Sequence, residues 1–144
     1  MILLPCAFVS ANNYWGLPHF EAFFFKIFGL VFIAVGILIF LYCTKLFVNL
    51  GKGTPIPIEP PTKLVTNGWY QYTRNPIYIG YIAIVLGEFF LLGRILLLLY
   101  LVVFFLSIHL YLLQREEPKL KKRFNAEYLE YMKRTPRWLP NIFF

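Results

Sequence analysis

The stretch "FEAFFFKIFGLVFIAVGILIFLYCTKLFV" at residues 20–48 decides the fold class. It is almost entirely apolar and long enough for a helix that crosses about 30 Å of hydrocarbon. Lys26 and Lys45 lie near its ends, where a lysine side chain can reach the lipid headgroups. The whole chain agrees, since 59% of its 144 residues are hydrophobic, and soluble domains are closer to half apolar. We therefore expect a single domain, residues 1–144, of an all-α integral membrane protein.

Two further apolar segments follow, at residues 77–92 and 95–113. Only Gly93 and Arg94 separate them, and helices joined by so short a turn form an antiparallel hairpin. The sequence thus predicts about three transmembrane helices. Glu88 is close to the turn, and we expect it to pair with Arg94. Residues 1–18 lack a basic leader, so we interpret them as an interfacial or partly inserted segment.

Two polar segments complete the chain, a proline-rich loop at residues 49–76 and a charged tail at residues 114–144. In the tail, apolar residues recur at helical spacing and predict an interfacial amphipathic helix; they are Leu120, Phe124, Tyr128 and Tyr131. The tail holds eight Lys and Arg residues, the loop three and the hairpin turn one. The positive-inside rule then places loop and tail together in the cytoplasm.

This topology brings four polar residues to one cytoplasmic rim of the membrane: Arg74, Asn75, Glu116 and Glu117. Arginine can bind a carboxylate, and glutamates can bind an ammonium group or ribose hydroxyls. Ordinary interfacial charges would give the same pattern. At about 1.5 Å per residue, His109 and Tyr78 both lie roughly 23 Å from the turn, just inside this rim.

Several kinds of site are excluded or disfavoured by the sequence. Cys6 and Cys43 belong to no metal-binding or disulfide pattern, and no phosphate loop or dinucleotide fingerprint is present. The net charge of +7 comes mostly from residues that flank apolar runs. We therefore expect a lipid bilayer as partner, with no nucleic acid and no metal.

Two motifs carry a resemblance that covers about residues 50–140. The first is "PPTKLVTNGWYQYTRNPIYIGY" at residues 60–81, and the second is "REEPKLKKRFNAEYLEYMKRTPRWLP" at residues 115–140. In order and separation they resemble the isoprenylcysteine carboxyl methyltransferase family, which belongs with the membrane phospholipid methyltransferases. The resemblance implies S-adenosyl-L-methionine bound at the cytoplasmic rim. It also implies a lipophilic or lipidated substrate that enters from the membrane.

The resemblance also assigns site residues by motif position. The implied cofactor-binding residues are Lys63, Leu64, Val65, Tyr70, Arg74, Asn75, Pro76, Tyr78, Glu116 and Glu117. Apart from the resemblance, our candidates for a direct part in catalysis are Arg115, His109 and Arg137; an amine acceptor would need a base such as His109 or a glutamate. Two positions depart from the family pattern: Asn75 stands where the prototype enzymes have histidine, and Asn125 where the motif has glycine.

Three other functions remain open from the sequence. A phospholipid N-methyltransferase would use the same cofactor on an ethanolamine headgroup. A non-catalytic membrane protein would use the charged tail to bind lipid or a partner. A steroid-reductase-like enzyme would bind a nicotinamide cofactor at a similar R-x-P-x-Y pattern. The expected chemistry is displacement at the sulfonium methyl, which depends mainly on orientation and desolvation.

Overall fold

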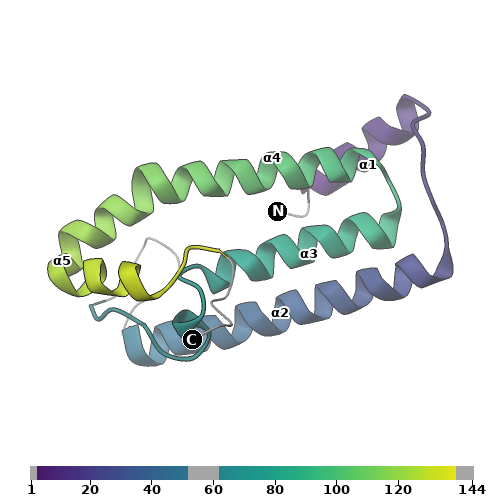
Figure 1. Ribbon diagram of the computed structural model, residues 1–144. Helices are drawn as coiled ribbons and strands as arrows, with labels where there is room; N and C mark the ends of the chain where they lie inside the picture. Colours follow the sequence, from purple (N-terminus) through teal and green to yellow (C-terminus); the bar gives the residue numbers. More distant parts are fainter. Residues whose placement is uncertain (1–2, 52–61, 139–144) are drawn as a thin grey trace. The chain divides into compact units, whose positions relative to one another are not determined.

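The computed structural model describes residues 3–51 and 62–138, and this part of the chain is helical without a strand (Figure 1). Its α-helices are α1 (Leu3–Tyr14), α2 (Phe23–Gly51), α3 (Pro76–Leu92), α4 (Leu96–Tyr111) and α5 (Glu117–Arg134). A 3-10 turn, η1 (Gly68–Gln71), precedes α3, and a π-helical turn, η2 (Leu112–Glu116), connects α4 to α5. Two helices are long and apolar enough to cross a membrane, α2 and the continuous helix Leu96–Arg134, while α3 is shorter. The expected all-α membrane fold is confirmed.

The helix boundaries differ from the predicted ones for local reasons. The first long helix begins at Phe23 rather than at residue 20, because the Phe20 amide donates to the carbonyl oxygen of Gly93 (3.0 Å). It ends at Gly51, whose carbonyl oxygen accepts hydrogen bonds from the amides of Thr62 (2.9 Å) and Lys63 (3.4 Å). Residues 52–61 of the predicted loop and 139–144 of the predicted tail lie outside the described residues.

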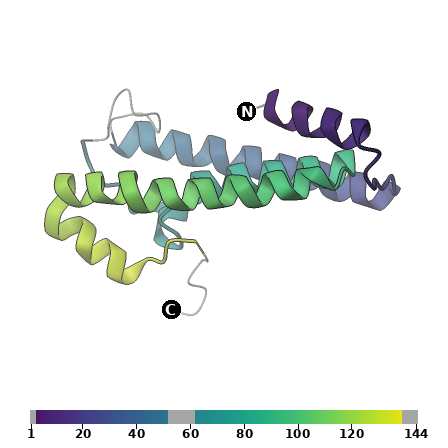
Figure 2. The ribbon, with the colours of Figure 1, turned by 90° about the horizontal axis from the view of Figure 1, so that it is seen from above.

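The chain divides into two units, and the first comprises Met1–Leu38 and Gly80–His109. Within it, α1 packs against the start of α4 (Figure 2). The Phe8 and Tyr100 ring centroids are 5.2 Å apart, and the Asn12 side chain accepts a hydrogen bond from the Leu96 amide (3.2 Å). The N-terminal segment is thus a helix held against the hairpin. The predicted Glu88–Arg94 ion pair is wrong for the described residues: Arg94 instead forms a backbone bridge with His19.

Glycines bring α2 and α3 into close backbone contact in this unit. A Cβ atom added at Gly29 would lie 2.6 Å from the Leu91 amide nitrogen and 2.7 Å from the Gly87 carbonyl oxygen. One added at Gly36 would lie 2.6 Å from the carbonyl oxygen of Gly80. Small residues at such positions are how membrane helices approach closely, since no hydrophobic effect drives them together in lipid.

We expect Gly29→Ala to lower the free energy of unfolding by about 2 kcal/mol, because the new methyl group meets backbone atoms that cannot turn aside. Urea unfolding in detergent micelles measures the change. The control is Val31→Ala on the same helix, where the side chain is 52% exposed and the expected change is small. A Gly29→Ala protein as stable as the control would contradict the close contact.

The second unit comprises Ile39–Ile79 and Leu110–Phe144 and contains the end of α2, η1, the start of α3, and α5. The tyrosines of the predicted stripe on α5 are buried: Tyr128 is 2% exposed and Tyr131 6%. The Tyr131 hydroxyl donates to the Tyr70 carbonyl oxygen at 2.6 Å, which ties α5 to η1. The Phe47 ring of α2 lies 6.2 Å from that of Tyr70. The amphipathic helix is confirmed, but it continues from the apolar helix through η2 rather than beginning separately.

Asn125 interrupts α5 with φ 43° and ψ −119°, a backbone conformation that favours glycine. We expect Asn125→Gly to raise the free energy of unfolding by about 1 kcal/mol, because glycine adopts these angles without the clash of a Cβ atom. Asn125→Ala, which keeps the Cβ atom and loses the amide, should lower stability. Thermal unfolding of the three proteins compares them, and equal midpoints would contradict the strain.

Candidate functional site

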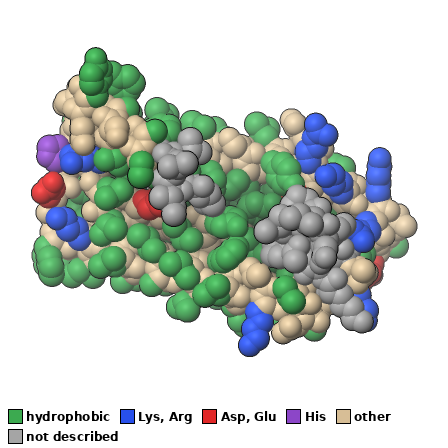
Figure 3. Space-filling model, turned by 180° about the vertical axis from the view of Figure 1, so that it is seen from behind, with side chains coloured by type: hydrophobic (Ala, Val, Ile, Leu, Met, Phe, Trp, Pro, Cys, Tyr) green, Lys and Arg blue, Asp and Glu red, His purple; other side chains and the backbone are tan. Residues whose placement is uncertain are grey.

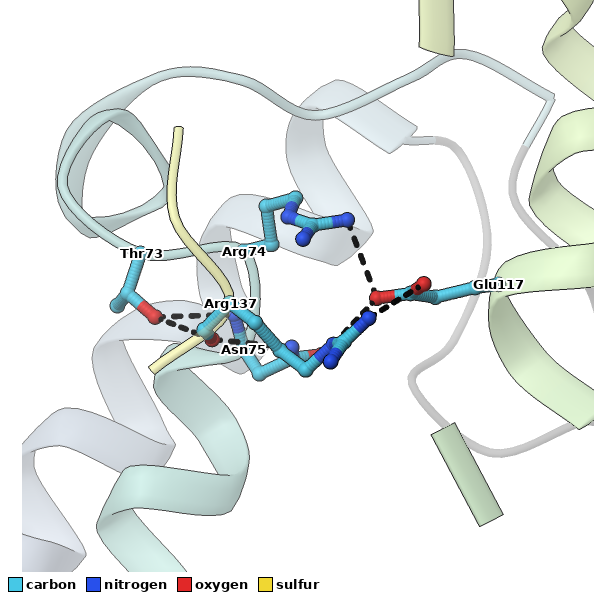
Figure 4. Close-up of polar contacts among 5 residues, drawn as sticks. All are labelled: Thr73, Arg74, Asn75, Glu117 and Arg137. Atoms are coloured by element: carbon cyan, nitrogen blue, oxygen red, sulfur yellow. Dashed lines mark hydrogen bonds and ion pairs between the residues drawn. The ribbon is translucent and has the colours of Figure 1, made fainter. Parts of the chain in front are cut away.

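Glu117 lies between two arginines in the second unit (Figure 4). Arg137 approaches it with two nitrogens, Nε to Oε1 at 2.7 Å and Nη2 to Oε2 at 3.0 Å. Arg74 donates from Nη1 to Oε1 at 3.1 Å. The Glu117 and Arg74 side chains are only 6% and 9% exposed. A buried carboxylate with two guanidinium partners is a charge cluster held by several hydrogen bonds.

The two arginines of this cluster favour the ionised form of the Glu117 carboxyl group. Glu117 lies beyond the apolar span, and burial alone would raise the pKa of its carboxyl group. The hydrogen bond from Arg137 and the charges of Arg74 and Arg137 outweigh burial, so the pKa of Glu117 is lowered. The same hydrogen bond raises the pKa of Arg137. Glu117 therefore stays a carboxylate at neutral pH, with its oxygens already occupied.

The chain after α5 returns to residues 73–75 and binds them through the backbone (Figure 4). The carbonyl oxygen of Arg137 accepts hydrogen bonds from the Thr73 hydroxyl (2.9 Å) and the Asn75 side-chain amide (3.1 Å). The Arg74 amide donates to the Pro136 carbonyl oxygen at 2.9 Å. We call residues 73–75 together with 135–137 the clasp. Thr73 was missed by the sequence analysis, because no local pattern reports a contact between segments more than sixty residues apart.

Glu116, the neighbouring carboxylate, has a different environment. The Tyr78 hydroxyl donates to its Oε2 at 2.6 Å, and the described residues offer no hydrogen bond to its Oε1. Burial raises the pKa of Glu116, while the hydrogen bond from Tyr78 opposes the rise. Within the described part of the chain, Oε1 of Glu116 therefore accepts no hydrogen bond. The Arg74 Nε atom is buried and has no partner among the described residues, so this unit also holds an unused donor.

The other predicted site residues differ in burial and do not all belong to the second unit. Val65, Tyr70 and Pro76 are buried in the second unit, Leu64 is half-buried, and Lys63 is exposed. Asn75 is buried, and its side-chain amide donates to the Arg137 carbonyl oxygen. Arg115 is exposed. His109 belongs to the first unit, where its ring stacks on Phe105 with centroids 6.1 Å apart. Across residues 3–51 and 62–138, no three His, Cys, Asp or Glu side chains gather as metal ligands would.

Comparisons with known proteins give one positive finding. The sequence model of the phospholipid methyltransferase family matches residues 24–127, which include all of α2 except its first residue, α3, α4 and both glutamates of the site. Neither the search of curated proteins nor the search of solved structures returned a match. The family match covers well over half of the chain, the whole of the first motif and residues 115–127 of the second. The chain belongs to the phospholipid methyltransferase family, and we therefore assign it to the membrane methyltransferases.

Proposed function

We propose that the protein transfers a methyl group from S-adenosyl-L-methionine to a small lipophilic or lipidated acceptor at the membrane surface. The observation that carries this proposal is a pair of polar atoms in the second unit, Oε1 of Glu116 and the buried Nε of Arg74, for which residues 3–51 and 62–138 supply no hydrogen-bond partner. Family membership supports the reaction class. The bound cofactor would supply a sulfonium methyl group, which is open to in-line displacement.

The donor set fits the cofactor's chemistry. S-adenosyl-L-methionine carries an ammonium and a carboxylate on its amino-acid part and two hydroxyls on its ribose. Arg74 Nε is a donor suited to a carboxylate, and the Glu116 oxygen is an acceptor suited to an ammonium or hydroxyl group. A buried site makes such bonds stronger than they would be in water. Lys63, Leu64, Val65, Tyr70, Pro76 and Tyr78 are proposed as its neighbours.

The clasp gives Asn75, Glu117 and Arg137 a positioning role in this proposal. Arg137 and Arg74 occupy Glu117, and the Arg137 carbonyl oxygen occupies the Asn75 amide. These groups hold the backbone of residues 73–75, which immediately precedes α3, and Tyr78 lies in the first turn of that helix. Because Glu117 and Asn75 make these internal contacts, the internal hydrogen bonds of the cluster do not require Glu116 Oε1 or Arg74 Nε. In this proposal those two atoms bind the ligand. Fixed orientation is the main contribution that a protein makes to methyl transfer.

The acceptor approaches from the lipid phase in this proposal. Apolar side chains face outward along α2 and α4, as expected for helices in contact with lipid (Figure 3); they include Phe28, Leu38, Leu41, Leu99 and Leu106, each more than half exposed. We propose three spans, with the loop and the tail in the cytoplasm as the positive-inside rule predicts.

Two acceptor classes fit the site. A lipidated cysteine carboxylate is ionised at pH 7 and needs no base, whereas an ethanolamine headgroup must first lose a proton. His109, Arg115 and Arg137 stay predictions for a direct part in the reaction. The second candidate function, phospholipid N-methylation, is favoured by the description of the matching family.

Methyl transfer from radiolabelled cofactor tests both functions. The purified protein is assayed in parallel on a farnesylcysteine analogue and on phosphatidylethanolamine, with Glu116→Gln as the matched inactive variant. Label on the first acceptor supports the carboxylate function, and label on the second supports N-methylation. If the folded protein binds S-adenosylhomocysteine but labels neither acceptor, cofactor binding is supported and both proposed acceptor classes are contradicted.

A further inference from the structure

Helix α5 and the residues next to it carry a basic surface outside the hydrogen-bonded contacts of Glu116 and Glu117 described above. The Lys and Arg residues at or next to this helix all have exposed side chains; they are Arg115, Lys119, Lys121, Lys122, Arg123, Lys133 and Arg134. Among the described residues only Arg134 is in an ion pair, with Glu130 at 3.2 Å. Figure 3 shows Lys and Arg side chains grouped on part of the surface. The other six side chains of this surface form no ion pair within the described part of the chain.

Three of these residues share one face of the helix. Lys119, Lys122 and Arg123 are spaced three and four residues apart, so their side chains lie next to one another. They precede the interruption at Asn125. On the opposite side of the same stretch of helix, the Glu117 side chain is buried inside the unit. The trio, which we call the basic face, points away from that packing.

The basic face is close to the lipid headgroups because of its position in the chain. The last residue of the apolar span is Leu113, and Lys119 and Lys122 follow it by six and nine residues. At about 1.5 Å per residue, the two backbone positions lie at most about 9 and 14 Å further along the helix. The surface potential of an anionic membrane extends over about 8–10 Å at physiological salt, and a lysine side chain reaches several ångströms towards it.

We propose that the basic face binds the negatively charged headgroups of an anionic phospholipid bilayer and holds α5 against the membrane surface. Two features select this partner: the clustering of unpaired positive charge, and the short distance from the end of a membrane span. The proposal does not depend on methyl transfer, and it applies equally to the Glu116→Gln variant. It assigns a lipid preference to a surface that the cofactor site does not use.

The experiment measures the association of spin-labelled phosphatidylglycerol and phosphatidylcholine with the full-length protein in phosphatidylcholine vesicles. The test variant is Lys119→Gln with Lys122→Gln. The control is Lys26→Gln with Lys45→Gln, which removes the same charge from two exposed lysines of α2 that are too far apart to bind one headgroup together. Circular dichroism checks that both variants stay folded.

We expect wild type to prefer phosphatidylglycerol and the test variant to lose about fivefold of that preference for each lysine removed. The control should lose less than twofold. High salt should abolish the wild-type preference, since the contact is electrostatic. Equal preference in wild type and test variant, or an equal loss in the control, would overturn the basic face as a lipid-binding site.

Discussion

Replacing Glu117 with glutamine is expected to lower the free energy of unfolding by about 3 kcal/mol. Glutamine has nearly the same shape but no charge, so it would leave the guanidinium groups of Arg74 and Arg137 without their anion. Arg74 is 9% exposed and Glu117 6%, and removing one partner of a buried ion pair typically costs about 3–5 kcal/mol. The clasp should loosen as well, because Arg137 holds residues 73 and 75 through its carbonyl oxygen.

Glu130→Gln is the matched control for this change. Glu130 forms an ion pair with Arg134 at 3.2 Å on the same helix, but the two side chains are 68% and 72% exposed. Such a pair contributes at most about 0.5 kcal/mol. Urea unfolding in detergent micelles, followed by tryptophan fluorescence, compares the two variants with wild type. Equal, small losses in both would mean that the Glu117 cluster does not hold the unit together.

The stability contributed by Glu117 should also depend on pH. Its pKa is lowered in the folded protein, whereas an unfolded glutamate titrates at about 4.3. The contribution is therefore fully present above that value and is lost as the pH falls through the lower folded pKa. We expect the difference in stability between wild type and Glu117→Gln to shrink below about pH 4. A difference that stays constant down to pH 2 would contradict this origin.

The helices were predictable from the sequence because their signal is local. Long apolar runs gave α2, α3 and α4 to within a few residues, and the spacing of Tyr128 and Tyr131 gave the buried face of α5. The motif at residues 115–117 and the motif at residues 73–78 were both expected near one site, and the contacts of Arg74 with Glu117 and of Tyr78 with Glu116 confirm that they meet.

The different hydrogen-bond partners of Glu116 and Glu117 were not predictable from the sequence. Adjacent residues on a helix point in directions about 100° apart, so each meets different neighbours, and those neighbours come from distant parts of the chain. Arg137 reaches Glu117 across 20 residues, and Tyr78 reaches Glu116 across 38. Asn75 shows the same limit: its amide was expected to contact the cofactor, and in the structure it donates to the Arg137 carbonyl oxygen.

Replacing Glu116 with glutamine is expected to weaken binding of S-adenosylhomocysteine at least tenfold while leaving the fold intact. The described residues give Glu116 a single hydrogen bond, from the Tyr78 hydroxyl, and a glutamine carbonyl oxygen can accept it. The substitution thus removes the negative charge and keeps the internal contact. A hydrogen bond to a charged group is worth about 1.5–3 kcal/mol, which corresponds to roughly ten- to a hundredfold in affinity.

Isothermal titration calorimetry of the detergent-purified protein measures this affinity, with Glu127→Gln as the control. Glu127 is an exposed glutamate of the same helix, outside the clasp and the site, and its loss should leave affinity unchanged. Tyr78→Phe should have a smaller effect than Glu116→Gln, because it frees Oε2 of the carboxylate without removing its charge.

The two glutamate variants together separate ligand binding from folding. If Glu116 binds the cofactor and Glu117 holds the clasp, Glu116→Gln lowers affinity at unchanged stability, and Glu117→Gln lowers stability first. Full affinity in a folded Glu116→Gln protein would show that the cofactor does not use this carboxylate. Binding would then have to depend on donors such as Arg74 Nε, which is buried and has no hydrogen-bond partner among the described residues.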